Sequence, residues 1–277
     1  MVNLKTILFW NLAKKQNALE HLSCLALTHR VDVFLLAESS DDLSPVLQDI
    51  NKLGLGTYRE ADYEKTKVRA ITRLAKRDFV HRYTSQGREV AIWRLRSAVM
   101  TPPEILIAGV LLPSKMGGNS VEDQASVAME VSQEIAAFED RSQHRNSLLI
   151  GDFNMYPYDP GMTLATGIHG LMTRALAELP DREHRGQLRR RFYNPMWGLL
   201  GDRTVGPAGS HFWRSSVLHN PHWGMLDQAL LRPSLIQYLK DVFVLDFDGN
   251  HNLLGSDGAP DKNHLSDHLP IMLRLNV

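Results

Sequence analysis

The chain has 277 residues, of which 43% are hydrophobic and 22% are charged, a composition that excludes intrinsic disorder and supports a sizeable core. Its 31 basic and 31 acidic residues balance, so net charge gives no general attraction to nucleic acid or to a membrane surface. The lone cysteine, Cys24, excludes an internal disulfide and makes the cytoplasm the expected location.

The first part of the chain predicts buried strands separated by a helix. Residues 4–10 and 31–37 are short apolar runs typical of buried strands, and leucines at helical spacing lie between them. Residues 67–74 and 89–95 alternate apolar and polar side chains, which indicates antiparallel strands with one solvated face. The apolar run at residues 7–10 is too short for a signal-peptide core, and no stretch approaches the roughly 18 residues of a membrane span. We therefore expect no export or membrane segment.

The rest of the chain predicts more strands than helices. Strands are expected at residues 104–112, 147–150, 224–231, 242–247 and 269–275, with a helix at 121–140. Residues 161–179 are expected to be rich in helix, and residues 180–224 to be loop-like. The last strands are not each separated by a helix, which favours two sheets packed on each other with helices outside. We expect one α/β domain over residues 1–277.

Polar side chains recur immediately after the predicted buried strands. They are Asn11, Glu38, Asp152 with Asn154, Asp227, and Asp267 with His268. Carboxylates at strand ends can converge on one rim of a sheet, and such hard oxygen ligands suit Mg²⁺ or Mn²⁺. A metal held by carboxylates and amides can neutralise a phosphodiester and position a water for attack. The pattern therefore indicates a hydrolase of phosphate esters.

Six short segments occur in a characteristic order along almost the whole chain. They are Phe9-Trp10-Asn11-Leu12, Leu36-Ala37-Glu38, Val90-Ala91-Ile92-Trp93, Ile150-Gly151-Asp152-Phe153-Asn154, Met225-Leu226-Asp227-Gln228 and Leu265-Ser266-Asp267-His268-Leu269-Pro270. The ordered set resembles the endonuclease/exonuclease/phosphatase superfamily, the deoxyribonuclease I-like proteins. The resemblance implies a four-layer α/β fold, with two facing mixed β-sheets, outer α-helices and a cleft at the sheet rim.

The resemblance also implies which strand-end residues bind the metal, the attacking water and the phosphate. Glu38 would be the principal ligand of Mg²⁺ or Mn²⁺, with Asn11 close by and Asp267 contributing. Asp152 would orient or deprotonate the attacking water, and Asn154 would hold the phosphate.

A histidine and an aspartate complete the implied site. His268 would bind the developing charge of the phosphate. Asp227 would fix the tautomer of that imidazole and raise its basicity, as a carboxylate partner does for many functional histidines.

The sequence departs from the superfamily pattern at two positions. Leu111 stands where many members carry a histidine, and abasic-site endonucleases a tyrosine, that assists the leaving oxygen. Ala13 replaces an aspartate of the abasic-site branch, so we do not place the chain there. A replacement proton donor could come from the irregular segment or from the loop after residue 112, the candidates being His211, His219, His222 and Lys115.

Two basic segments could contact nucleic acid. Residues 65–82 carry seven basic residues against one acidic residue, although such a pattern is usually just a solvated strand face. Arg189, Arg190 and Arg191 precede Phe192 and Tyr193, and charge next to aromatic rings can bind phosphate and stack a base. We predict substrate binding for the three arginines. Met196-Trp197 and Phe212-Trp213 are expected to be packing residues.

Taken together, these features predict a magnesium-dependent phosphodiesterase that cleaves nucleic acid by direct attack of a metal-assisted water, with DNA favoured over RNA. One alternative is a phosphatase or phosphodiesterase for a small or lipid-linked phosphate ester, since fold does not settle substrate. Another, motivated by Leu111, is a catalytically silent nucleic-acid-binding protein. Clustered carboxylates argue against it, because they repel one another when no metal is bound.

Overall fold

Two mixed β-sheets form the centre of the computed structural model, which describes residues 3–115, 118–214 and 221–277. Within those residues the first sheet has six strands, in spatial order β16 (Leu239–Val244), β17 (Ile271–Asn276), β1 (Leu4–Asn11), β2 (Val33–Ala37), β4 (Val68–Thr72) and β3 (Arg59–Glu60). The second has seven, in the order β5 (Phe79–Thr84), β6 (Val90–Arg96), β7 (Glu104–Leu111), β8 (Ser147–Asp152), β15 (Asp227–Leu231), β12 (Phe192–Tyr193) and β9 (Gly170–Leu171). Each sheet combines parallel and antiparallel pairs.

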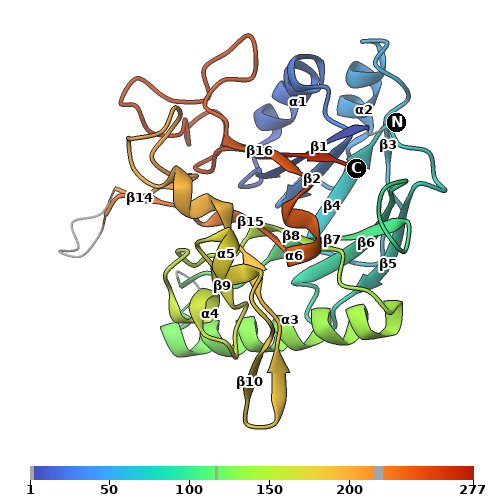
Figure 1. Cartoon of the computed structure of the whole chain (residues 1–277). Helices are drawn as coiled ribbons and strands as arrows, with labels where there is room; N and C mark the ends of the chain where they lie inside the picture. Colours follow the sequence, from blue (N-terminus) through green and yellow to red (C-terminus); the bar gives the residue numbers. More distant parts are fainter. Residues whose placement is uncertain (1–2, 116–117, 215–220) are drawn as a thin grey trace.

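Helices cover the outer face of each sheet. Figure 1 shows α1 (Gln16–His29) and α2 (Ser44–Asn51) over the first sheet and the long α3 (Val121–Ser142) under the second. A capping box, in which Ser120 and Asp123 exchange side-chain and backbone hydrogen bonds, starts α3. The α1 helix ends at Arg30 in the left-handed conformation. Four layers result, as the sequence predicts.

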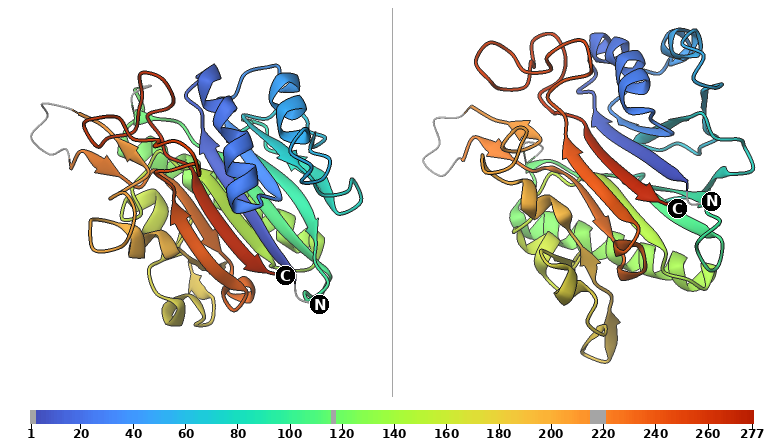
Figure 2. Two further views of the ribbon diagram at one scale, coloured as in Figure 1. Left: turned by 90° about the horizontal axis from the view of Figure 1, so that it is seen from above. Right: turned by 45° about the horizontal axis from the view of Figure 1, so that its top comes forward.

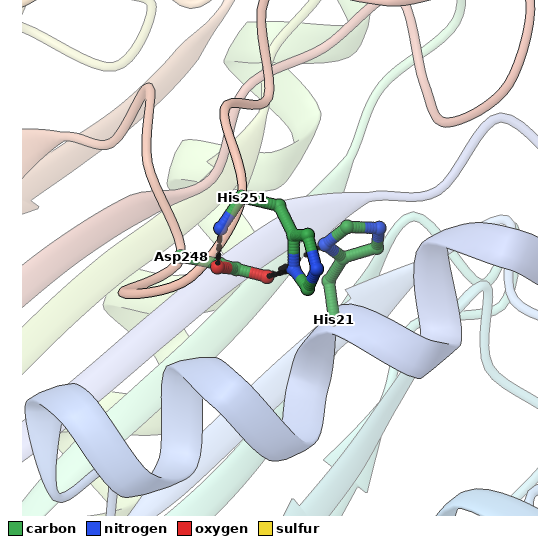
Figure 3. Close-up of side chains that lie close together, drawn as sticks. All are labelled: His21, Asp248 and His251. Carbon is green, nitrogen blue, oxygen red and sulfur yellow. Dashed lines mark hydrogen bonds and ion pairs between the residues drawn. The ribbon is translucent and has the colours of Figure 1, made fainter.

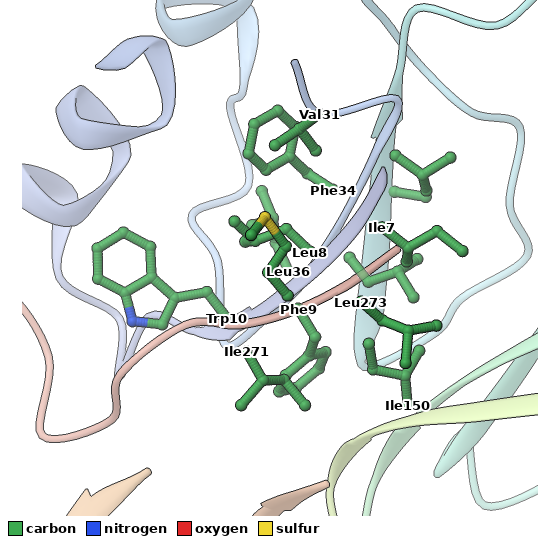
Figure 4. Packing of buried hydrophobic residues seen from close by; sticks show 14 of the residues in the cluster. Ile7, Leu8, Phe9, Trp10, Val31, Phe34, Leu36, Ile150, Ile271 and Leu273 are labelled. Carbon is green, nitrogen blue, oxygen red and sulfur yellow. The ribbon is translucent and has the colours of Figure 1, made fainter. Parts of the chain in front are cut away.

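The core follows from strands that are apolar on both faces. In β8, Leu148 and Ile150 belong to the core between the sheets, whereas Leu149 packs toward α3, because successive side chains of a strand point to opposite faces. Figure 4 shows Ile150 near Ile7 and Leu273 of the facing sheet. Figure 2 shows the first and last strands of the chain side by side, where β1 and β17 pair antiparallel.

Three expected elements need correction. Residues 161–179 are not rich in helix. They hold only the short α4 (Pro160–Thr163), apart from its first residue, and the single turn α5 (Arg174–Ala177), with β9 between the two. The glycines there serve close packing, and a Cβ at Gly167 would lie 2.2 Å from the carbonyl oxygen of Gly161. The predicted strand at 242–247 begins and ends three residues earlier, as β16. The predicted strand at 224–231 is divided between β14 (Trp223–Gly224) and β15.

The segment expected to be loop-like contains short paired strands. This segment contains the strands β10 (Arg182–His184), β11 (Gln187–Arg189) and β13 (His211–Phe212) and the 3-10 helix η2 (Pro195–Leu199). The short helix α6 (Pro233–Ile236) follows β15. Strand β10 pairs with β11, and β13 with β14. No helix in the described parts of the chain combines the length and apolar character needed to cross a membrane.

A buried ion pair joins α3 to the end of β15. The Arg232 guanidinium donates from Nε and Nη2 to the Glu139 carboxylate at 2.8 and 3.1 Å, and each residue is only 1% exposed. Arg190 also donates to Glu139 at 2.9 Å, and the Arg232 guanidinium carbon lies 3.6 Å from the centre of the Phe192 ring. A buried charge that keeps several partners is compensated, but one that loses its partner is not.

We expect Glu139→Gln to lower the free energy of unfolding by roughly 3 kcal/mol, because it leaves the buried Arg232 charge without its carboxylate. Urea denaturation followed by circular dichroism would measure the change. The matched control is Asp49→Asn, which removes the exposed Lys52–Asp49 pair and should change stability little. Equal stabilities for Glu139→Gln and the unmodified protein would contradict the prediction.

Candidate active site

The predicted strand-end residues, apart from the fully buried Asp227, line one cleft of about 420 Å³. Strand pairing explains the convergence. Asn11 is opposite Ala37 in the parallel pair β1–β2, so Glu38 follows directly at the same edge. Asp227 is opposite Asp152 in the antiparallel pair β8–β15. The lining combines predicted residues with others, namely Asn11, Ala13, Glu38, Ser114, Lys115, Asp152, Asn154, Tyr156, His211, Trp213, Leu226, Asp267 and His268.

Asp152 is 1% exposed and is held by two asparagines. Asn11 Nδ2 donates to Asp152 Oδ2 at 3.0 Å and to Glu38 Oε1 at 3.3 Å, linking the two carboxylates. The Asn154 backbone N–H donates to Asp152 Oδ1 at 2.8 Å. Burial raises the pKa of Asp152, although the charge of His268 partly offsets this effect. A carboxylate with a raised pKa and a fixed orientation is suited to accepting a proton.

The amide of Asn154 serves mainly to position its neighbours. Its Nδ2 donates to Leu112 O at 2.9 Å and to Asp152 Oδ2 at 3.2 Å, which accounts for both amide hydrogens. In this geometry Asn154 therefore orients Asp152, and the predicted phosphate contact would require one of these bonds to be exchanged.

His268 and Asp227 form a buried pair beside Asp152. His268 Nδ1 lies 2.8 Å from Asp227 Oδ2, and His268 Nε2 lies 4.0 Å from Asp152 Oδ2. Burial opposes the charge on this imidazole, but Asp227 and Asp152 outweigh it and raise the pKa of His268 to about 10. The proton on Nδ1 is fixed by Asp227, which directs Nε2 toward Asp152.

Asp267 lies next to a second histidine. His211 Nε2 is 3.7 Å from Asp267 Oδ2, and the His211 ring lies 4.6 Å from that of His268. Burial works against ionisation of Asp267, but His211 and the charge of His268 lower its pKa to about 2. The cleft therefore holds an ionised carboxylate with two imidazoles beside it.

Positive φ angles mark the backbone around the cleft. Ala13, Glu38 and Asn154 have φ values of 46°, 47° and 51°, in the left-handed region that is costly for residues other than glycine. Such strain persists only where surrounding contacts enforce it. Here it coincides with the residues that point into the cleft.

Three residues to which the sequence analysis gives no role hold the site residues in place. Trp10 Nε1 donates to His268 O at 2.9 Å. Ser266 Oγ donates to Asn11 O at 2.7 Å and accepts from His268 N. Ser210 Oγ accepts from the Asp227 backbone N–H at 3.0 Å. Their signal in the sequence is weak, because serine next to a motif is common in turns.

Comparisons with known proteins agree with this architecture at the level of fold. No protein-family model and no curated protein matched the sequence. An AP endonuclease from Archaeoglobus fulgidus aligns with a TM-score of 0.57 at 12% identity, over 99% of this chain and 100% of that one. D. rerio TDP2 complexed with single strand DNA product gives 0.56 at 13%, over 99% and 100%.

A third structure carries the name of the superfamily. It is an endonuclease/exonuclease/phosphatase family protein from Bacteroides thetaiotaomicron, with a TM-score of 0.55 at 12% identity over 99% of this chain and 98% of that one. This chain has the deoxyribonuclease I-like fold. The predicted fold class is confirmed.

Leu111 is the last residue of β7. It pairs with Asp152 between β7 and β8 and packs against the main core, so an apolar side chain stands next to the site. Of the candidate replacement donors, His211 and Lys115 line the cleft. Lys115 Nζ lies 3.5 Å from Asp159. His222 contacts Trp213 O at 3.2 Å, and His219 lies outside the described residues.

The three predicted substrate-binding arginines do not line the cleft. Arg190 pairs with Glu139 and Asp140 of α3, Arg189 contacts Gln187, and Arg191 donates to Pro180 O. Figure 1 shows the β10–β11 hairpin at the bottom of the molecule near α3, whereas β14, whose partner strand carries His211, lies at the left. The structure therefore does not bring this segment to the candidate site.

The basic segment at residues 65–82 is largely neutralised. Its ion pairs include Lys67 with Glu89, Arg69 with Glu60, Arg73 with Asp32, Lys76 with Asp62 and Arg77 with Asp78. The exposed Lys76–Asp62 pair contributes little energy, but all of these pairs reduce the positive potential of the surface. The solvated-face interpretation is favoured over a nucleic-acid patch.

Proposed function

We propose that this protein is a divalent-metal-dependent phosphodiesterase that hydrolyses nucleic acid, with DNA favoured over RNA. One observation carries the proposal. Residues as distant in sequence as Asn11, Asp152 and His268 meet in one cleft, linked by hydrogen bonds and charge. Carboxylates that converge in this way repel one another unless a cation or a phosphate-binding group stabilises them.

The donor set suits a hard divalent cation. Glu38 and Asp267 offer carboxylate oxygens at the cleft, and Asp267 is held ionised. The Asn11 amide oxygen, which accepts from the Ala13 N–H, would have to turn toward the ion. Oxygen donors of this type favour Mg²⁺ or Mn²⁺. These three residues would hold the ion, which when bound would act as a Lewis acid toward a phosphoryl oxygen.

The chain's own residues account for the proton transfers. Asp152 accepts a proton from the attacking water while the water oxygen bonds to phosphorus and the bond to the leaving oxygen breaks. Asn11 and Asn154 keep the Asp152 carboxylate oriented. His268, held in its charged form by Asp227, stabilises negative charge on the phosphoryl oxygens. His211, at the same cleft, is placed to donate a proton to the leaving oxygen.

Aromatic side chains at the cleft support a nucleic-acid substrate. Tyr156 and Trp213 line the cleft, and the rings of Tyr156 and Tyr158 stack with centres 5.2 Å apart. Aromatic faces of this kind can stack on bases of a single strand. The similarly folded TDP2 has been solved with a single strand DNA product, which supports the choice of DNA.

A small phosphate ester is the second candidate substrate, because the basic segment at residues 65–82 is ion-paired rather than free. The dependence of the hydrolysis rate on salt concentration distinguishes the two candidate substrates. Cleavage of DNA should weaken steeply as salt rises, since phosphate contacts release counterions, whereas hydrolysis of a small ester should respond much less.

We further propose a cytoplasmic location, for which the single cysteine is the support.

Metal dependence tests the proposed function directly. We expect hydrolysis of single-stranded DNA, plasmid DNA, RNA and an aryl phosphodiester to cease in excess chelator and to return with Mg²⁺ or Mn²⁺, because Glu38 and Asp267 would lose the ion they hold. Full turnover in chelator would contradict a metal mechanism. Failure to cleave any of these substrates with either ion would favour the silent binding protein.

A further inference from the structure

A second cluster of metal-ligating side chains lies outside the candidate active site. It consists of His21 on α1 and of Asp248 and His251 on the long loop after β16. Figure 3 shows both imidazoles turned toward the same carboxylate. His21 Nδ1 lies 2.6 Å from Asp248 Oδ2, and His251 Nδ1 lies 3.3 Å from the same oxygen. One nitrogen from each ring thus faces one carboxylate oxygen.

The Asp248 carboxylate is prepared as an ionised ligand. Its side chain is 0% exposed, and its Oδ1 accepts backbone N–H groups from Asn250 at 2.7 Å and His251 at 2.6 Å. Burial alone would raise the pKa of Asp248, but these donors and the imidazoles lower it below its usual value. Since the backbone occupies Oδ1, Oδ2 is left facing the two rings.

The backbone of the turn fixes this arrangement against the helix. Gly249 has a φ of 110°, and a Cβ there would lie 1.9 Å from Thr28 Oγ1 on α1. Only glycine allows the turn to approach the helix so closely. Asp248 N also donates to His251 O at 3.1 Å, which closes the turn. Asp248 and His251 are thereby held next to His21, which is 227 residues earlier than Asp248.

A neighbouring pair shows what an ordinary surface contact looks like in the same loop. His264 Nδ1 lies 3.0 Å from each oxygen of Asp261, at the same spacing in sequence as Asp248 and His251. However, the side chains of His264 and Asp261 are 74% and 25% exposed, and the metal-ligating groups in the described part of the chain do not include them. Burial of the carboxylate and a second imidazole distinguish the Asp248 cluster.

We propose that His21, Asp248 and His251 form a binding site for a borderline divalent ion such as Zn²⁺, separate from the candidate active site. Two imidazole nitrogens and a carboxylate oxygen are a common donor set for zinc. The bound ion would fasten the loop to α1. Both segments lead to the cleft, because α1 begins five residues after Asn11 and the loop continues to Asp267. The ion would therefore stabilise the cleft from outside.

Zinc titration of the full chain in excess Mg²⁺ tests the site. We expect calorimetry to show one zinc equivalent that His21→Ala and His251→Ala both lose and that the matched control His264→Ala keeps. Asp267→Asn should also keep this equivalent, which separates it from zinc bound at the cleft. Added zinc should raise the melting temperature of the unmodified protein and of His264→Ala, but much less that of His251→Ala.

The outcomes are separable even if one variant is unstable. His251 has a side chain that is 62% exposed, so its alanine variant should fold, and circular dichroism would check this. Unchanged zinc binding in folded His251→Ala and His21→Ala would overturn the proposal. The cluster would then be only a carboxylate that is hydrogen-bonded to two imidazoles. Neither readout depends on nuclease activity, so failure here would not bear on the proposed function.

Discussion

Replacing Asp152 by asparagine is expected to reduce phosphodiester hydrolysis by about 10²–10⁴-fold, the usual contribution of a positioned general base. Asparagine retains the size of the side chain, but its single oxygen can accept only one of the two bonds that the carboxylate takes from the backbone of Asn154 and from Asn11. It cannot take a proton from water. The loss should therefore appear mainly in kcat, because substrate contacts made by other residues remain.

Steady-state kinetics on DNA and on an aryl phosphodiester would measure the Asp152→Asn effect. Thermal melting and circular dichroism would establish that the variant is folded. Asp49→Asn, the same chemical change at an exposed position of α2, is the matched control and should keep full activity. Near-normal kcat in folded Asp152→Asn would mean that the base is elsewhere.

Alanine at His211 should reduce cleavage of DNA by about 10²–10⁴-fold while sparing an activated aryl ester, if His211 is the general acid that replaces the group absent at Leu111. An alkoxide leaving group needs a proton as its bond to phosphorus breaks, whereas a nitrophenolate departs without one. His211 lines the cleft and contacts His268, so it is within reach of the reacting groups. Selective damage on the poor leaving group would identify the proton donor.

A second variant makes the test of His211 sharper. Adding Leu111→His to His211→Ala should restore part of the DNA cleavage, provided that the imidazole fits among the residues that now pack against leucine. The control is His264→Ala, which removes an exposed histidine that pairs with Asp261 outside the cleft. Equal rates for His211→Ala and the unmodified protein on both substrates would exclude His211 and leave Lys115 or a metal-assisted water as the donor.

The sequence by itself determined the fold class and the positions at which chemistry was to be expected. Asn11, Glu38 and Asp152 each follow a run of apolar residues, and strand burial is a local property that such a run specifies directly. Their meeting at one edge then follows from strand pairing. The registers Asn11–Ala37 and Asp227–Asp152 bring residues together that the chain separates widely.

Local patterns were less informative where side chains are neutralised by distant partners. Arg190 belongs to a run of arginines that predicts phosphate binding, yet Glu139 and Asp140, about fifty residues earlier, pair with it. Residues 161–179 were expected to be helical, but glycine contacts such as that of Gly167 with Gly161 allow a tight irregular path instead. Neither effect has a signal within a short window of sequence.

Only the tertiary structure decided which histidines lie at functional positions. His211 lies beside His268 because the β13–β14 pair is bridged to the backbone at His268, and no spacing in the chain specifies that contact. His21 and Asp248 meet because Gly249 allows a turn to pack against α1. Contacts over such distances depend on how whole elements pack, since packing free energy is shared among many residues and is not encoded in any one segment.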